Sequence, residues 1–202
     1  MSTRSLLVAL AALIAVPAAS AQTSFGLRAG LNVSDFSGDD APANTDPRLG
    51  FAGGLFARLP VGASGLYVQP EVGYSMKGVS AEDGTGNDAT IALDYVEVPV
   101  LLGYATPVTD SGLMVGAYAG PALGIKVRES LDLGFDGGSG SVDSDLFKDL
   151  DVGAAFGVTV GAGAFGIDGR YTLGLTNVLD TDDDANVRNG VFTIAGTYTF
   201  GR

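Results

Sequence analysis

The sequence predicts an all-β protein: an eight-stranded antiparallel up-and-down transmembrane β-barrel that follows an N-terminal signal peptide. Three observations lead to this fold class. The 202-residue chain opens with an export signal, and eight later segments alternate between apolar and polar residues. The connections between these segments are alternately long and short. Long connections on one side and tight turns on the other are typical of barrels in outer membranes.

The start of the chain has the three parts of a secretory signal peptide. Arg4 supplies the positive charge, residues 6–16 form an apolar run, and residues 19–21 read Ala-Ser-Ala, a small-residue cleavage site. The apolar run is shorter than the roughly 20 residues that a membrane-spanning helix needs. We therefore expect a signal peptide over residues 1–21 and one outer-membrane β-barrel domain over residues 22–202.

The strand signal recurs in eight segments, whose lengths suit tilted membrane strands of about 9–11 residues or slightly more. They are residues 24–34, 49–59, 65–77, 91–104, 113–128, 150–161, 164–176 and 190–200.

Alternation with a period of two is clearest in the fourth of these segments. Val96, Val98 and Val100 lie on one face of that strand, and Tyr95 and Glu97 lie on the other. In a membrane barrel the apolar face contacts lipid and the polar face lines the lumen. A water-soluble, ligand-binding barrel also alternates, with its apolar face turned inward, and alternation alone does not separate the two.

The charged residues on the polar faces predict a filled lumen, because eight strands enclose a space just wide enough for their own side chains. The residues expected to point inward are Arg28, Glu71, Lys77, Glu97, Lys126, Arg128, Asp151, Asp168 and Arg170. Since both signs of charge are present, we expect a structural network of ion pairs that includes Arg28, Glu71, Glu97, Asp168 and Arg170. A narrow ion-selective path or a gated pore is the alternative.

Most of the acid lies in the long connections. Of 23 acidic residues, 17 fall in residues 34–47, 78–90, 129–149 and 180–189. We expect these four connections to be solvated extracellular loops, with residues 137–140 (Gly-Gly-Ser-Gly) as a flexible tip.

One acidic loop partly matches a calcium-binding motif. Asp180, Asp182 and Asp184 have the spacing of the first ligands of a calcium loop. The motif also requires Gly and Glu at positions where Ala185 and Val191 stand. The loop is thus a weak candidate for cation binding, and diffuse binding of divalent cations by the outer loops is the simpler expectation.

Composition argues against catalysis and against nucleic acid as a partner. The chain contains no His and no Cys, which removes Ser-His-Asp and Cys-His chemistry and His-based metal sites. Its formal net charge is −12, whereas binding to nucleic acid depends on Lys and Arg that neutralise phosphates. We expect neither an enzyme nor a bound cofactor.

Several strand motifs together are similar to a known family. Residues 71–78 read Glu-Val-Gly-Tyr-Ser-Met-Lys-Gly, residues 95–102 read Tyr-Val-Glu-Val-Pro-Val-Leu-Leu, residues 120–121 read Gly-Pro, and residues 170–177 read Arg-Tyr-Thr-Leu-Gly-Leu-Thr-Asn. As a set they resemble the PorT-like small outer-membrane β-barrel proteins of Bacteroidota and relatives. The resemblance implies an outer-membrane barrel without catalytic residues.

These observations predict a protein of the cell outer membrane that is embedded in lipid and has a structural or interaction role in the envelope. Divalent cations at the outer loops and another envelope protein are the partners that we expect. A narrow channel for small solutes or ions, an accessory component of a protein secretion system, and a soluble ligand-binding barrel remain as alternatives.

Overall fold

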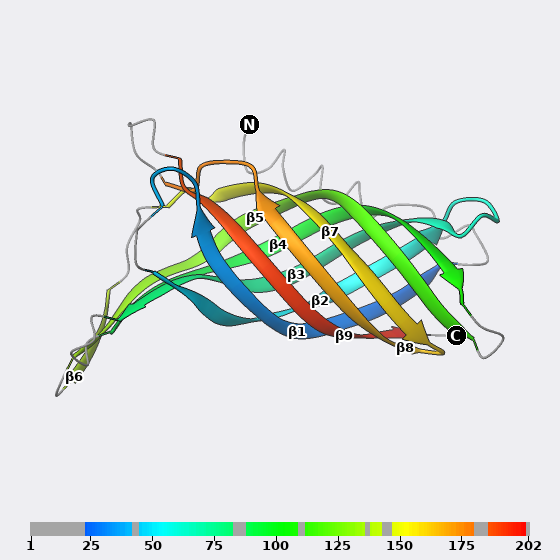
Figure 1. Ribbon diagram of the computed structural model, residues 1–202, viewed down its shortest axis with the longest axis horizontal. Helices are drawn as coiled ribbons and strands as arrows, with labels where there is room; N and C mark the ends of the chain where they lie inside the picture. Colours follow the sequence, from blue (N-terminus) through cyan, green and yellow to red (C-terminus); the bar gives the residue numbers. More distant parts are fainter. Residues whose placement is uncertain are drawn as a thin grey trace.

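Eight antiparallel strands close into a barrel in the computed structural model, as the sequence predicted (Figure 1). The structure describes residues 23–41, 45–82, 88–108, 112–135, 138–142, 147–179 and 186–200. The strands are β1 (Ser24–Ser37), β2 (Asp46–Pro60), β3 (Leu66–Glu82), β4 (Asp88–Pro107), β5 (Leu113–Phe135), β6 (Gly138–Val142), β7 (Leu150–Ala162), β8 (Phe165–Gly174) and β9 (Arg188–Phe200).

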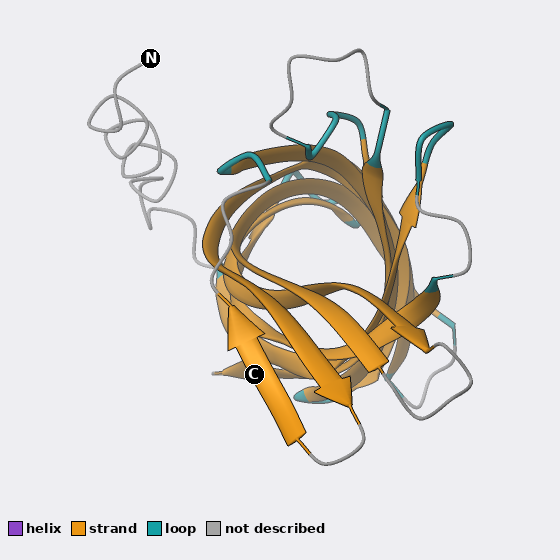
Figure 2. Ribbon diagram, turned by 90° about the vertical axis from the view of Figure 1, so that its left-hand side faces the viewer, coloured by secondary structure: helices purple, strands orange, loops and turns teal. Residues whose placement is uncertain are grey.

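The eight strands of the barrel are β1–β5 and β7–β9, and each of these pairs with the next, so that β5 pairs with β7; β6 is an additional short strand that pairs with β5. Strand β1 pairs with β9 to close the ring, with Phe25 opposite Phe200. Figure 2, seen from the end with the long connections, shows the closed ring of strands. Because the start of β1 meets the end of β9, both ends of the barrel domain lie at the short-turn end.

Most of the large apolar side chains on the strands point outward. On β8, Phe165 and Ile167 are 71% and 67% exposed, whereas Asp168 and Arg170 are buried. A water-soluble barrel would have the reverse arrangement, with its apolar face inside. An apolar outer surface around a polar interior is the arrangement of a transmembrane barrel. No helix in the described part of the chain is long and apolar enough to cross a bilayer.

Aromatic side chains gather on the outer surface near the short turns. The rings of Phe165 and Tyr198 lie 5.1 Å apart between centroids, and those of Tyr198 and Phe200 lie 5.3 Å apart. Aromatic girdles of this kind mark the membrane interface of outer-membrane barrels.

Two of the acidic connections differ from the expected loops because the strands continue into them. Strand β3 runs to Glu82 and β4 starts at Asp88, while β5 continues to Phe135 and pairs with β6. These extensions project from one side of the long-connection end (Figure 1). The expectation of a flexible tip at residues 137–140 was wrong in part, since β6 begins at Gly138. Continued pairing satisfies backbone groups that a loop would leave to water.

Glycines on the inner face of the strands make room for large side chains that lie across them. A Cβ at Gly103 would sit 2.2 Å from Cζ of Tyr67, and a Cβ at Gly157 would sit 2.5 Å from the hydroxyl of Tyr118. Such distances are far below van der Waals contact. Tyr67 and Tyr118 can therefore fold flat against the barrel wall only because these two neighbours have no side chain.

Candidate functional site

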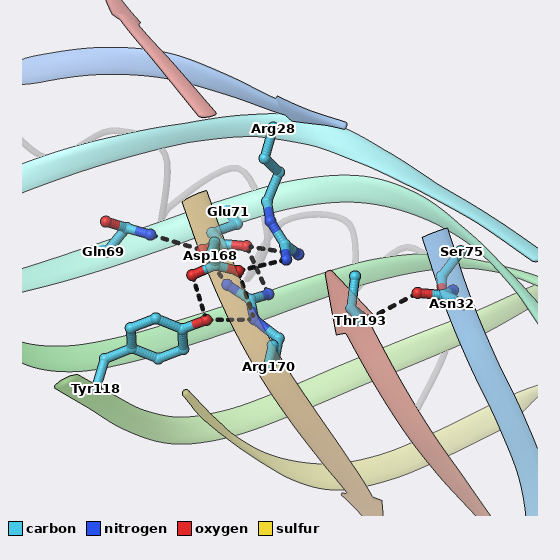
Figure 3. A network of polar contacts seen from close by, with 9 residues as sticks. All are labelled: Arg28, Asn32, Gln69, Glu71, Ser75, Tyr118, Asp168, Arg170 and Thr193. Atoms are coloured by element: carbon cyan, nitrogen blue, oxygen red, sulfur yellow. Dashed lines mark hydrogen bonds and ion pairs between the residues drawn. The ribbon is translucent and has the colours of Figure 1, made fainter. Parts of the chain in front are cut away.

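The lumen contains a compact group of ionised and polar side chains, here called the lower cluster: Arg28, Glu71, Tyr118, Asp168 and Arg170. Strands β1, β3, β5 and β8 supply these residues, and all of them point toward one another (Figure 3). The lower cluster contains two guanidinium groups and two carboxylates, so its formal charge is balanced.

A bidentate ion pair between Arg170 and Glu71 forms the centre of the lower cluster. Nη1 and Nη2 of Arg170 donate to Oε2 and Oε1 of Glu71, each at 2.8 Å. Gln69 adds a hydrogen bond from Nε2 to Oε1 of Glu71 at 2.7 Å. Paired forks of this kind are the strongest geometry for an arginine and a carboxylate.

Asp168 joins the second arginine to the centre of the lower cluster. Nη2 of Arg28 lies 2.7 Å from Oδ1 of Asp168, and the hydroxyl of Tyr118 donates to Oδ2 at 2.6 Å. Nε of Arg170 donates to the Tyr118 oxygen at 3.0 Å. Arg28 also lies 3.9 Å from Glu71. Tyr118 thus links the two ion pairs across the lumen.

Next to the lower cluster, on the side of the long-connection end, lies a layer of uncharged polar side chains. Nδ2 of Asn32 donates to Oγ of Ser75 at 2.9 Å and to the carbonyl of Met76 at 3.1 Å, and Thr193 donates to Oδ1 of Asn32 at 2.7 Å. The amide of Asn32 therefore has partners for both its nitrogen and its oxygen. A buried amide that is satisfied in this way fixes the distance between β1, β3 and β9.

Glu97 does not belong to the lower cluster. It lies in a separate group, here called the upper cluster: Lys77, Glu97, Asp151 and Asn189. Nζ of Lys77 lies 2.7 Å from Oε1 of Glu97 and 3.1 Å from Oδ2 of Asp151, which also accepts a 2.9 Å hydrogen bond from Asn189. The structure thus brings four of the five predicted network residues together and places the fifth one layer away.

An apolar cap covers the long-connection end of the lumen. Its buried members are Phe36, Val79, Leu93, Tyr95, Phe147, Val178 and Val187. The rings of Phe36 and Phe147 stack with centroids 5.8 Å apart. Sequence analysis missed this cap, because its members come from separate strands and connections and show no local pattern. Beside it, Nζ of Lys126 lies 2.7 Å from Oε2 of Glu129.

Arg128 was expected to point inward, and this expectation was wrong. A bulge at Val127 places Tyr95 opposite Lys126 and Asp94 opposite Arg128, so the strand alternation shifts by one residue. The side chain of Arg128 is 58% exposed as a result.

The same region contains a carboxylate on the outward face of the barrel wall. Asp94 shares its strand parity with Val96, which lies on the outward face, yet its own side chain is buried. The Tyr74 hydroxyl donates to its Oδ2 at 2.5 Å, and Arg48 and Arg128 each lie 3.9 Å from one of its oxygens. Sequence analysis assigned no place to Asp94. These three neighbours separate its charge from the surrounding lipid.

Asp180, Asp182 and Asp184 lie outside the described residues, so the weak calcium candidate stays a prediction. Across the ranges that the structure describes, no group of three or more acidic side chains is arranged to hold a metal ion.

A closed antiparallel barrel with an apolar outer surface and a polar, filled interior defines an outer-membrane β-barrel protein. The chain belongs to the family described as outer membrane protein beta-barrel domain, whose model matches residues 19–180. The protein is therefore located in the outer membrane, with lipid around its apolar surface.

Solved structures of bacterial outer-membrane proteins are similar to this chain at low identity. They include Ail of Yersinia pestis, solved with the heparin analogue sucrose octasulfate, at 14% identity (88% of this chain, 99% of that chain, TM-score 0.48). Neisserial surface protein A is 15% identical (88% and 99%, TM-score 0.49), and OprG from Pseudomonas aeruginosa is 14% identical (89% and 96%, TM-score 0.47). No curated protein matches the sequence.

Proposed function

We propose that this protein is a non-conducting, non-enzymatic barrel with a structural or interaction role in the cell envelope, which presents its strand extensions outside the membrane. The main support is the lower cluster, which crosses the lumen with two balanced arginine–carboxylate pairs. The apolar cap gives further support because it closes the long-connection end. Ions that cross the lumen would have to displace both.

Conductance in planar bilayers tests this proposal. We expect protein that is fully folded, by its heat-modifiable mobility on gels, to give no discrete conductance steps. The double variant Glu71→Ala/Arg170→Ala removes the central pair and keeps the apolar cap, so it should also give no discrete steps if the cap closes the lumen by itself. Discrete steps from the unaltered protein would contradict the proposal and would favour the alternative, a narrow channel for small solutes or ions.

An interaction role requires a partner outside the membrane. The strand extensions and the acidic connections are the part of the chain available to an envelope protein or to divalent cations. Crosslinking in native envelopes, compared between the full protein and a variant without residues 132–141, tests this role. A specific crosslinked partner that the shortened variant loses would support it, and identical crosslinks from both proteins would count against it.

Two finer assignments form part of the proposal. Residues 1–21 act as a signal peptide, so the N-terminal sequence of the membrane-inserted protein should begin at Gln22. The chain is also a PorT-like member of its family. The second candidate function, an accessory component of a protein secretion system, does not follow from that assignment and needs its own test: deletion of the gene should reduce secretion of exported substrates. Normal secretion in the deletion strain would exclude it.

A further inference from the structure

Two arginines flank the buried carboxylate of Asp94 on the outward face of the barrel wall. These three residues are here called the wall cluster: Arg48, Asp94 and Arg128. Nη1 of Arg48 lies 3.9 Å from Oδ1 of Asp94, and Nη1 of Arg128 lies 3.9 Å from Oδ2. Both distances are too long for hydrogen bonds. Since the wall cluster has two positive charges and one negative charge, its formal charge is +1.

Both arginines lie where the regular pairing of the strands is interrupted. The bulge at Val127 turns Arg128 to the outward face. Arg48 lies within a register shift in β2, and its Nη1 donates to the carbonyl oxygen of Lys77. Bulges often redirect side chains next to functional sites. The two interruptions together bring two arginines to one place on a mainly apolar surface.

Arg128 is available to a ligand outside the barrel. Its side chain is 58% exposed, and its guanidinium donates no hydrogen bond to any residue that the structure describes. Arg48 is 15% exposed and is held by the Lys77 carbonyl. A guanidinium has five N–H donors in a planar arrangement that matches the oxygens of a phosphate. The wall cluster thus offers one fixed arginine and one that can close over an anion.

The position of the wall cluster along β4 places it at the level of lipid headgroups. Tyr104 is an exposed aromatic residue near the short-turn end of β4, and Asp94 lies ten residues earlier in the same strand. At a rise of about 3.4 Å per residue and a tilt of about 40°, ten residues climb about 25 Å. The apolar band of an outer-membrane barrel is also about 25 Å tall, with aromatic residues at both borders. Tyr104 and the exposed Tyr74 beside Asp94 therefore mark the two interfaces, and the wall cluster lies at the outer one.

We propose that the wall cluster binds a phosphate group of a lipid in the outer leaflet of the membrane. The guanidinium groups of Arg128 and Arg48 donate hydrogen bonds to the phosphate oxygens, and one negative charge on the phosphate balances the cluster. The acyl chains of the same lipid pack along Val96 and Ile125, which lie opposite each other on the outward face, one step closer to the membrane centre. The proposal does not depend on whether the lumen conducts, because the wall cluster lies outside it.

Native mass spectrometry of the folded protein in detergent tests the site with defined lipids. The probes are lipid A with both phosphate groups, the same lipid A after enzymatic removal of its phosphates, and inorganic phosphate. We expect one retained copy of the phosphorylated lipid A and at least tenfold weaker retention of the dephosphorylated form. Inorganic phosphate at millimolar concentration should not displace the lipid, because it lacks the acyl chains that contact the wall.

Three variants assign the binding to the wall cluster. Arg128→Gln should weaken retention of the phosphorylated lipid A at least tenfold. The matched control Arg188→Gln alters an arginine of β9, on the opposite side of the barrel from β4, and should retain the lipid like the unaltered protein. Asp94→Asn should retain it at least as well, because the formal charge of the wall cluster rises to +2.

Four results would overturn the proposal. They are equal retention of the two forms of lipid A, equal behaviour of Arg128→Gln and Arg188→Gln, displacement of the lipid by inorganic phosphate, and loss of retention in folded Asp94→Asn. Displacement by phosphate would assign the site to a free anion, and loss in Asp94→Asn would assign the binding to the carboxylate.

Discussion

Glu71 and Arg170 are 99 residues apart in the sequence and face each other across the lumen, with both oxygens of one 2.8 Å from nitrogens of the other. Both side chains are 4% exposed. Their pairing joins β3 to β8, two strands that are not neighbours in the barrel. The lower cluster thus connects opposite walls by side chains alone, which braces the barrel against collapse or opening.

Arg170→Met should destabilise the barrel strongly. The change leaves the Glu71 carboxylate buried without its main partner, which costs about 3–5 kcal/mol. Urea unfolding in lipid vesicles measures the loss. The double variant Glu71→Gln/Arg170→Met should recover part of it, because no unpaired charge remains. If the stability lost in the double variant equals the sum of the losses in Arg170→Met and Glu71→Gln, the two side chains are not coupled.

The two carboxylates of the upper cluster should contribute unequally. Asp151 accepts from both Lys77 and Asn189 and is buried, whereas the Glu97 side chain is 18% exposed. Asp151→Asn should therefore cost about 3 kcal/mol, and Glu97→Gln about 1 kcal/mol, because water partly replaces its ion pair. The same unfolding measurement compares the two variants directly. Equal losses would mean that Glu97 is as fully buried in the membrane as Asp151.

Gly157→Ala should disturb the lower cluster without touching any charge. The added Cβ would lie 2.5 Å from both the Tyr118 hydroxyl and the carbonyl oxygen of Gly169, so the ring must move away from Asp168 and the backbone of β8 must shift as well. Overpacking of this kind costs about 1–3 kcal/mol. Gly169→Ala is the control, since a Cβ there meets nothing within 4 Å. Similar stabilities of the two variants would refute the close packing of Tyr118.

Tyr74→Phe should lower the stability of the barrel, because Tyr74 contacts the buried Asp94 on the outward face of the wall. The change removes the hydrogen bond that Asp94 accepts at 2.5 Å and leaves a buried carboxylate with one partner fewer. A hydrogen bond to a charged group contributes about 1.5–3 kcal/mol. Thermal unfolding in detergent should show a lower midpoint for Tyr74→Phe. Adding Asp94→Asn to Tyr74→Phe should reduce the loss, whereas an unchanged midpoint in the single variant would mean that lipid headgroups or water already solvate Asp94.

The fold class was predictable because its signals are local. A strand exposes alternate residues to lipid, so a segment such as 91–104 shows the period of two by itself. Strand ends were less predictable. Acidic residues in 78–90 and 129–149 indicated loops, yet apolar residues within these stretches, such as Val79 and Leu131, continue the pairing. Arg128 was misplaced because a bulge leaves no mark that a single sequence shows.

The sequence by itself determined eight alternating strands with charges of both signs on their polar faces, because alternation and turn spacing depend only on near neighbours in the chain. The tertiary structure decided that the apolar face lies outside. Only the tertiary structure decided which charges meet. Arg28 and Asp168 are 140 residues apart, and Glu97 pairs with Lys77 instead of the lower cluster. Strand tilt and register in the closed barrel set these contacts, and both are properties of all eight strands together.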